Sequence, residues 1–190
     1  MQVEFHRTGE RRYAVVVKRD GLPPLEMNPA PGFDALVPHD LMHFIVEKEL
    51  EIRRAIFGQI AEGGTAGTFH QAEAAHSKAD TRLRRSTKER GKKLLDAGKA
   101  DCAQSERATY VCLYDWLSKS ANPEHKTRAA QMKVTAQSIL GSMPESERKQ
   151  LNENFLARMR QRLDELSGKW SALKPGEHLT LEWSQMKHSR

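Results

Sequence analysis

The chain has 190 residues, of which 38% are hydrophobic and 29% are charged, and its formal net charge is +6 at pH 7. This length is enough for one hydrophobic core with an appendage, and the high charge content favours amphipathic helices around a modest core over a thick β-sandwich. No run of about 18 apolar residues occurs, so we expect no transmembrane helix. The first residues lack the apolar stretch of a signal peptide, so we expect a cytoplasmic protein.

The two cysteines, Cys102 and Cys112, support this expectation. They lie ten residues apart in a segment with helical character, where they point to different faces about 15 Å apart along the axis. A disulfide needs Cα atoms within about 7 Å of each other. We therefore expect two reduced thiols, as is usual in the cytoplasm.

The first part of the chain has the pattern of extended structure. Residues 2–6 and 12–18 alternate or are rich in β-branched side chains, which predicts an N-terminal hairpin. Asp20-Gly21 ends it, and residues 22–37 contain four prolines. Because proline interrupts helices, we expect an extended segment that crosses to the next element.

Helical patterns follow over most of the remaining chain. We expect a long helix from Pro38 to about Glu62, with Asp40 in its first turn and Gly63-Gly64 as its stop. A loop over 63–77 then leads to a mostly exposed helix. The expected later helices cover 78–97, 100–120, 123–140 and a long final stretch from 142 to about 173.

Residues 178–183 alternate again and predict a strand. A lone hairpin is marginal in water, so we expect this strand to join the N-terminal pair. The predicted class is α+β: a small antiparallel sheet with about four or five helices. Residues 1–77 and 174–190 would form a sheet-plus-helix module and 78–173 a projecting helical region, together in one continuous domain.

The sharpest chemical signal is the run from Pro38 to Glu47, which places His39, His43 and Glu47 at four-residue spacing. On a helix these positions lie along one face. Two imidazoles and a carboxylate are ligands for zinc or another divalent metal, and three protein ligands plus water are typical of catalytic zinc. Asp40 would orient a histidine or act as the catalytic base. If the site is catalytic, metal-activated water implies hydrolysis.

A structural interpretation of this run is also open. In that interpretation Asp40 interacts with free N–H groups at the helix start, and the histidines pair with buried carbonyl groups. His70, in the glycine-rich loop that follows, would serve as a fourth ligand or as an ordinary loop residue. The sequence therefore leaves open whether the protein is an enzyme, and it does not name a small-molecule substrate.

The second signal is a basic segment. Residues 78–99 contain nine basic and three acidic residues, so the net charge of this segment is +6, the same as that of the whole chain. A basic helix attracts phosphates, so an alternative function is a non-enzymatic module that binds nucleic acid or an acidic protein partner. The segment has no aromatic residue for base stacking. Two further interpretations are that the segment is only a solvated helix face, or that the protein is a helical assembly protein. The residues proposed for nucleic-acid contact are Arg82, Arg84, Arg85, Lys88, Lys92 and Lys93.

The string Pro-His-Asp-Leu-x-His-Phe-x-Val-Glu, with Arg-Thr-Gly-Glu-Arg-Arg-Tyr before it, resembles small bacterial proteins of unassigned function over roughly the first 70 residues and the last strand. This resemblance implies a bacterial origin. The His-Asp-x-x-His core is similar to the zinc motif of a ubiquinone-biosynthesis protein family. His39, Asp40 and His43 match that motif, whereas Ala55 stands where the family has a further glutamate.

Overall fold

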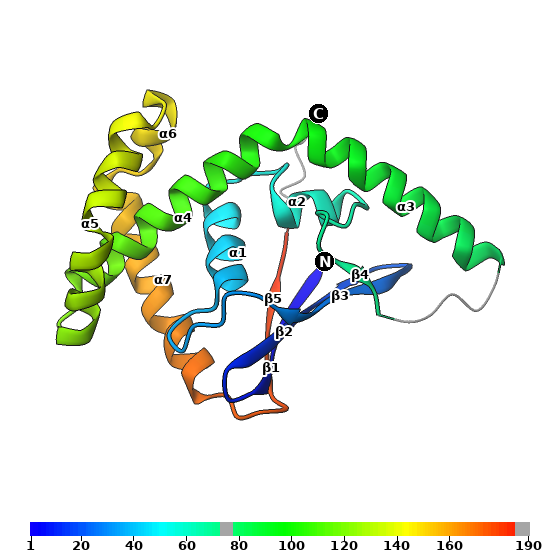
Figure 1. Ribbon diagram of the computed structural model, residues 1–190, viewed down its shortest axis with the longest axis horizontal. Coiled ribbons are helices and arrows are strands. Elements are labelled where there is room, and N and C mark those ends of the chain that lie inside the picture. Colours follow the sequence, from blue (N-terminus) through cyan, green and yellow to red (C-terminus); the bar gives the residue numbers. More distant parts are fainter. Residues whose placement is uncertain (73–77, 185–190) are drawn as a thin grey trace.

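The computed structural model describes residues 1–72 and 78–184 of the chain. Within these ranges a five-stranded antiparallel sheet is combined with seven helices, as Figure 1 shows. The predicted α+β class is confirmed, although the helices and strands outnumber those expected. Residues 73–77 of the predicted loop and 185–190 of the predicted C-terminal module lie outside the described residues.

The strand order in the sheet is β4-β3-β2-β1-β5. Strands β1 (Gln2–Gly9) and β2 (Arg12–Arg19) form the expected hairpin. Strand β5 (His178–Glu182) pairs antiparallel with β1, with Leu179 opposite Phe5. The predicted union of the C-terminal strand with the N-terminal hairpin is therefore confirmed.

The proline-rich segment is where the sheet is larger than expected. It is extended, as predicted, but residues 22–30 form strand β3 (Leu22–Ala30), which pairs with β2 through an irregular register. Its other neighbour, β4 (His70–Gln71), covers only Leu25 and Glu26. Prolines lack an N–H donor and are tolerated on a strand whose outer side is largely unpaired.

The single helix expected over 38–62 is wrong. Helix α1 (His39–Glu49) ends before a turn in which Glu51 has a φ of 54°, and helix α2 (Ile56–Ala61) follows. Residues 50–55 contain no glycine or proline that would predict this break. The chain is closely packed at Gly58, where a Cβ atom would lie 1.8 Å from the carbonyl oxygen of Arg53.

The helical region begins with α3 (Lys78–Ala97), α4 (Lys99–Lys119) and α5 (Pro123–Ser142), close to the predicted ranges. The expected final helix is divided into α6 (Glu145–Gln150) and α7 (Glu153–Ala172). Asn152 begins α7 as its N-cap, with its side-chain oxygen accepting from the Phe155 N–H at 3.0 Å. Asparagine is a preferred residue at this position, so the sequence did contain this signal.

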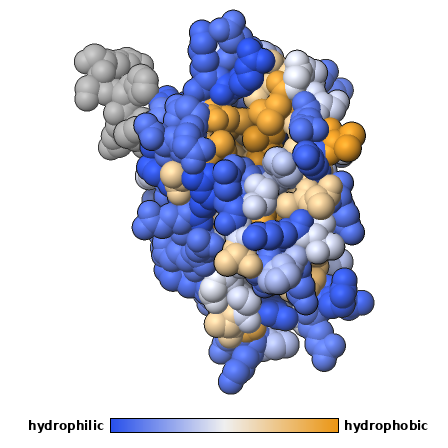
Figure 2. All heavy atoms as spheres, turned by 90° about the vertical axis from the view of Figure 1, so that its left-hand side faces the viewer, coloured by the Kyte–Doolittle hydropathy of each residue, from blue (hydrophilic) through white to orange (hydrophobic). Residues whose placement is uncertain are grey.

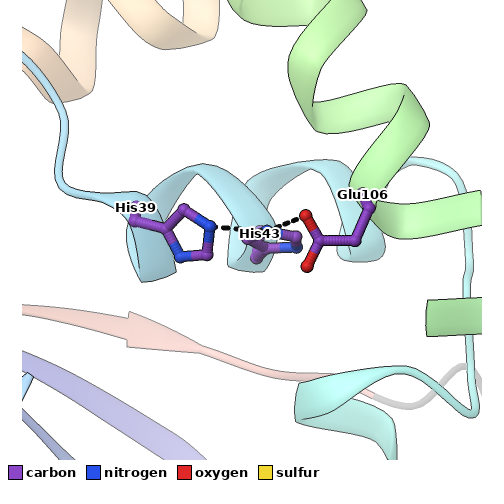
Figure 3. Close-up of side chains that lie close together, drawn as sticks. All are labelled: His39, His43 and Glu106. Carbon is purple, nitrogen blue, oxygen red and sulfur yellow. Dashed lines mark hydrogen bonds and ion pairs between the residues drawn. The ribbon is translucent and has the colours of Figure 1, made fainter. Parts of the chain in front are cut away.

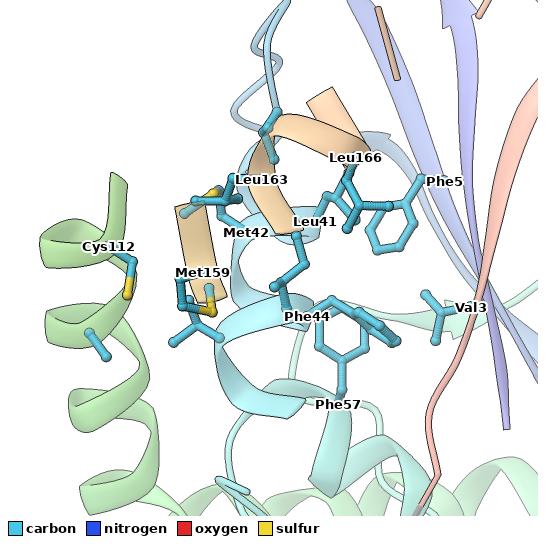
Figure 4. Close-up of a cluster of buried hydrophobic side chains, with 14 of the residues drawn as sticks. Val3, Phe5, Leu41, Met42, Phe44, Phe57, Cys112, Met159, Leu163 and Leu166 are labelled. Carbon is cyan, nitrogen blue, oxygen red and sulfur yellow. The ribbon is translucent and has the colours of Figure 1, made fainter. Parts of the chain in front are cut away.

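The main core lies between the sheet and the helices. Figure 4 shows buried side chains of β1, α1, α2, α4 and α7 that belong to this core. Phe5 of the sheet contacts Phe44 edge-to-face, with ring centroids 5.9 Å apart. Burial of such rings supplies much of the stabilisation. Helix α1 is therefore buried along most of its length, and this holds its histidines in place.

The outer face of the helical region, shown in Figure 2, is largely hydrophilic, with hydrophobic residues gathered near its upper part. Among the described residues, no helix is long and apolar enough to cross a membrane. Both cysteines are free: Cys112 is buried and Cys102 is half-buried.

Candidate metal centre

The start of α1 is fixed from several directions. The His39 N–H donates to the carbonyl oxygen of Gly32 at 3.1 Å. The Tyr13 hydroxyl of β2 donates to the carboxylate of Asp40. Trp170 of α7 donates its indole N–H to the carbonyl oxygen of Asp34 at 2.9 Å, which ties down the loop that leads into the helix. The position of His39 is thus set by the sheet and by α7.

Figure 3 shows His39 and His43 on successive turns of α1, with Glu106 reaching toward them from α4. The Nε2 atoms of the two histidines are 3.3 Å apart. The Nε2 atom of His43 lies 3.6 Å from Glu106 Oε2, and one ligand atom from each of the three residues lies within 4.8 Å of the others. The predicted convergence of His39 and His43 is therefore present.

The two separations from His43 Nε2, 3.3 and 3.6 Å, are close to those between ligands of a divalent metal. Bonds of about 2.0–2.1 Å in tetrahedral geometry place neighbouring ligand atoms about 3.3–3.4 Å apart. The site also has an open side, because the side chains of His39 and Glu106 are 48% and 64% exposed whereas that of His43 is 1% exposed. The group could therefore hold a metal ion between one buried and two accessible side chains.

The other edge of His43 is held by two polar side chains. Its Nδ1 atom lies 2.8 Å from the hydroxyl oxygen of Ser105, and that hydroxyl lies 2.9 Å from Glu47 Oε1. A serine has one proton to donate, and the glutamate accepts it, so the Nδ1–H of His43 donates to the serine. In neutral His43 the lone pair is then on Nε2, the atom that faces His39 and Glu106. Metal-ligating histidines are commonly fixed in this way.

The acidic surroundings favour positive charge at His43. Burial by itself lowers the pKa of His43, but the nearby carboxylates of Glu106 and Glu47, at 3.6 and 3.8 Å, outweigh it and raise the pKa to about 9. The pKa of Glu106 is lowered, chiefly by its interaction with His43. A buried imidazole between two carboxylates attracts a cation, whether a proton or a metal ion.

Among the described residues, the group that could hold a metal ion contains Glu106 and not the predicted Glu47. Its carboxylate accepts from the backbone N–H groups of Phe57 at 2.9 Å and Ile56 at 3.3 Å, as well as from Ser105. It is fully buried and lies at the Nδ1 edge of His43, 3.8 Å away. The turn after α1 brings the first N–H groups of α2 to this carboxylate, and Glu106 is the carboxylate in the group that could hold an ion.

Asp40 is buried, at 4% exposure. Burial raises the pKa of Tyr13, as does the charge of Asp40, so the tyrosine hydroxyl stays protonated and donates to Asp40. Asp40 Oδ1 also lies 3.8 Å from His39 Nδ1. Of the two roles expected for Asp40, this geometry favours orienting His39 over acting as a base, because the carboxylate is buried and accepts from Tyr13.

His70 lies apart from the cluster. It is in β4, its Nε2 atom is 3.4 Å from Glu26, and its side chain is 58% exposed. His70 is therefore not among the residues that could hold the ion, although it lines a pocket beside the basic helix.

The six basic residues proposed for nucleic-acid contact all lie on α3 but do not share one face. Arg84, Lys88 and Lys92 line a pocket of about 500 Å³ together with the segment that leads into β4. The other three of these basic residues do not line the pocket and are exposed: Arg82, Arg85 and Lys93. Binding of nucleic acid by these residues stays a prediction.

Ser105 and Glu106 were not found by sequence reasoning. They are about 60 residues from the histidines, and nothing in the local sequence distinguishes Glu106 from other helical acids. Ser105 did carry a weak signal, because it shares the buried face of α4 with Ala108, Thr109 and Cys112. A small polar residue on an apolar helix face requires a hydrogen-bond partner.

No protein-family model, no curated protein and no solved structure matches this chain. The resemblance of its histidine motif to the zinc motif of a ubiquinone-biosynthesis family therefore stays an expectation from the sequence.

Proposed function

We propose that this protein is a metal-dependent hydrolase in which His39, His43 and Glu106 bind zinc or a similar divalent ion. The main support is the convergence of one ligand atom from each of three residues: His43 Nε2 lies 3.3 Å from His39 Nε2 and 3.6 Å from Glu106 Oε2, and one edge of the group is open to solvent. Two histidines and one glutamate form a ligand set known in catalytic zinc sites.

The three proposed ligands have different roles at the site. His43 provides a buried ligand whose tautomer is set by Ser105 and Glu47. His39 and Glu106 provide accessible ligands and leave space for water on the solvent side. A bound zinc-like ion lowers the pKa of its water to about 7, which supplies a nucleophile at neutral pH. The same ligand set serves non-haem iron, so the identity of the metal is part of the test.

Metal binding is tested with Glu106→Gln. This residue is mostly exposed, so the neutral and nearly isosteric change leaves the fold intact while removing the anionic ligand. We expect wild type to retain about one equivalent of a divalent metal after dialysis and Glu106→Gln to bind it roughly 10–100-fold more weakly. The matched control is Glu124→Gln on α5, an exposed position away from the site, which should bind like wild type. Equal metal content in all three proteins would refute the site.

Hydrolysis is tested separately with p-nitrophenyl acetate and p-nitrophenyl phosphate. We expect metal-loaded wild type to cleave at least one of them, chelation to stop the reaction, and added zinc to restore it. Glu106→Gln should remain inactive under the same conditions. A protein that binds the metal at this site but hydrolyses neither ester would retain the metal centre and contradict the hydrolase assignment.

A further inference from the structure

A cavity lies between α3 and the segment of residues 65–71, and none of the three metal-holding residues lines it. Its volume is about 500 Å³, and no aspartate or glutamate is among its lining residues. Glu26, the partner of His70, does not line it. The polar and charged side chains that line this cavity, called here the basic pocket, are Thr65, His70, Gln71, Arg84, Thr87, Lys88 and Lys92.

The basic pocket is built by close contact between the loop and the helix. Gly91 is buried on α3, and a Cβ atom there would lie 3.2 Å from Thr65 Oγ1. A Cβ atom on Gly67 would lie 3.3 Å from a methyl carbon of Leu95, and Gly67 has a φ of 79°. These glycines let the loop lie against the helix, so the pocket has a packed floor.

The cations of the basic pocket are arranged in a row. Arg84, Lys88 and Lys92 follow at four-residue spacing, which places successive residues about 6 Å apart along one helix face. The Nε atom of Arg84 is buried and, within the part of the chain that the structure describes, has no hydrogen-bond partner. By contrast, Arg85 on the outer face is paired with Glu89 at 3.0 Å. The three cations that line the pocket therefore have no carboxylate among the other lining residues.

We propose that the basic pocket binds phosphate groups, carried either by a small phosphate ester or by the backbone of a single nucleic-acid strand. Arginine and lysine are the main phosphate-binding side chains, and a buried arginine N–H without a partner is costly until an anion accepts from it. The two threonines and Gln71 offer further donors. Phe69 is 5% exposed and is not available for base stacking, so recognition would be of phosphate rather than of bases.

The test compares two triple variants that lose the same charge. In the pocket variant Arg84, Lys88 and Lys92 are each changed to Gln, and in the control variant Arg82, Arg85 and Lys93 are each changed to Gln. Inorganic pyrophosphate is titrated by calorimetry and a fluorescent oligothymidylate by anisotropy. Chelator is present throughout, so the result does not depend on the metal centre. Circular dichroism checks folding, and the single variant Lys88→Gln, at an exposed position, is used if the pocket variant unfolds.

We expect the pocket variant to bind at least one probe about tenfold more weakly than wild type and the control variant to bind nearly as well as wild type. Loss confined to pyrophosphate would indicate a small phosphate ester. Loss for the oligonucleotide, with a slope of log K against log salt reduced by about 2, would indicate a strand, since each phosphate contact contributes about 0.7. Equal weakening in both triple variants would show diffuse surface charge only and would overturn the proposal, as would failure of wild type to bind either probe.

Discussion

The Nδ1 atom of His43 lies 2.8 Å from the hydroxyl oxygen of Ser105, although the two residues are 62 positions apart in the chain. The next residue, Glu106, approaches the opposite edge of the same imidazole. One turn of α4 thus both orients the buried histidine and provides the acid beside its ligand atom. This relationship makes the proposed metal centre depend on the packing of α4 against α1.

Ser105→Ala should weaken metal binding about 10–100-fold, because the histidine loses the partner that fixes its tautomer. It should also lower the free energy of unfolding by about 1–3 kcal/mol, since a carboxylate oxygen and a ring N–H lose a buried partner. Calorimetric metal titration and denaturant unfolding measure the two effects.

The control for Ser105→Ala is Thr109→Val, which removes another buried hydroxyl from the same face of α4. Within the described residues the Thr109 hydroxyl has no hydrogen-bond partner, so this change should leave stability equal or raise it by up to about 1 kcal/mol. Metal affinity should be unchanged. If the two variants lost metal affinity to the same extent, general loosening of α4 would be the explanation.

Gly32→Ala should displace His39. Gly32 has a φ of 72°, and a Cβ atom there would lie 2.7 Å from the Cβ atom of His39. The matched control is Gly21→Ala, where φ is 69° but nothing lies within 4 Å. Both should lose about 1–2 kcal/mol of stability through backbone strain. A metal titration should show weakened binding only in Gly32→Ala, and unchanged binding there would mean that His39 is not a ligand.

Glu47→Gln separates the expected ligand role from the observed structural one. The carboxylate accepts from two backbone N–H groups and from Ser105, so an amide, which has one acceptor oxygen, cannot replace all three contacts. We expect the free energy of unfolding to fall by about 2–4 kcal/mol. Metal binding should weaken less than in Glu106→Gln; complete loss of metal in a stably folded Glu47→Gln protein would restore Glu47 as a ligand.

Glu4 on the sheet should make stability depend on acid pH. Burial alone raises the pKa of Glu4, but hydrogen bonds from Lys18 and His6, at 2.6 and 2.9 Å, together with nearby positive charge, lower it overall. A lowered folded-state pKa stabilises the protein above the unfolded-state pKa, and this stabilisation is lost as the pH falls through the folded-state value. Glu4→Gln should therefore cost about 1 kcal/mol at neutral pH, a modest amount because Lys18 is half exposed.

Denaturant unfolding at neutral and acid pH checks this. The difference between wild type and Glu4→Gln should shrink as Glu4 is protonated, whereas Glu10→Gln, at the exposed turn between β1 and β2, should behave like wild type at every pH. A difference that does not change with pH would contradict the role given to the Glu4 charge.

The corrections to the sequence predictions have a common physical origin. Residues 22–30 were recognised as extended, but their pairing with β2 depends on what lies beside them in space. The end of α1 was missed because residues 50–55 favour a helix locally, whereas the turn at Glu51 is stabilised by contacts of α2 with Glu47. The start of α7 at Asn152 was predictable from its capping residue.

The sequence by itself determined the α+β class, the N-terminal hairpin with its C-terminal partner strand, and the two histidines on one helix face, because hydrophobic periodicity and residue spacing are local properties. Tertiary structure alone decided which acid approaches the histidines, which serine fixes His43, and which three of the six cations line the basic pocket. These depend on how α4 and α3 pack against α1 and the loop before β4, and such packing is set by contacts between residues far apart in the chain.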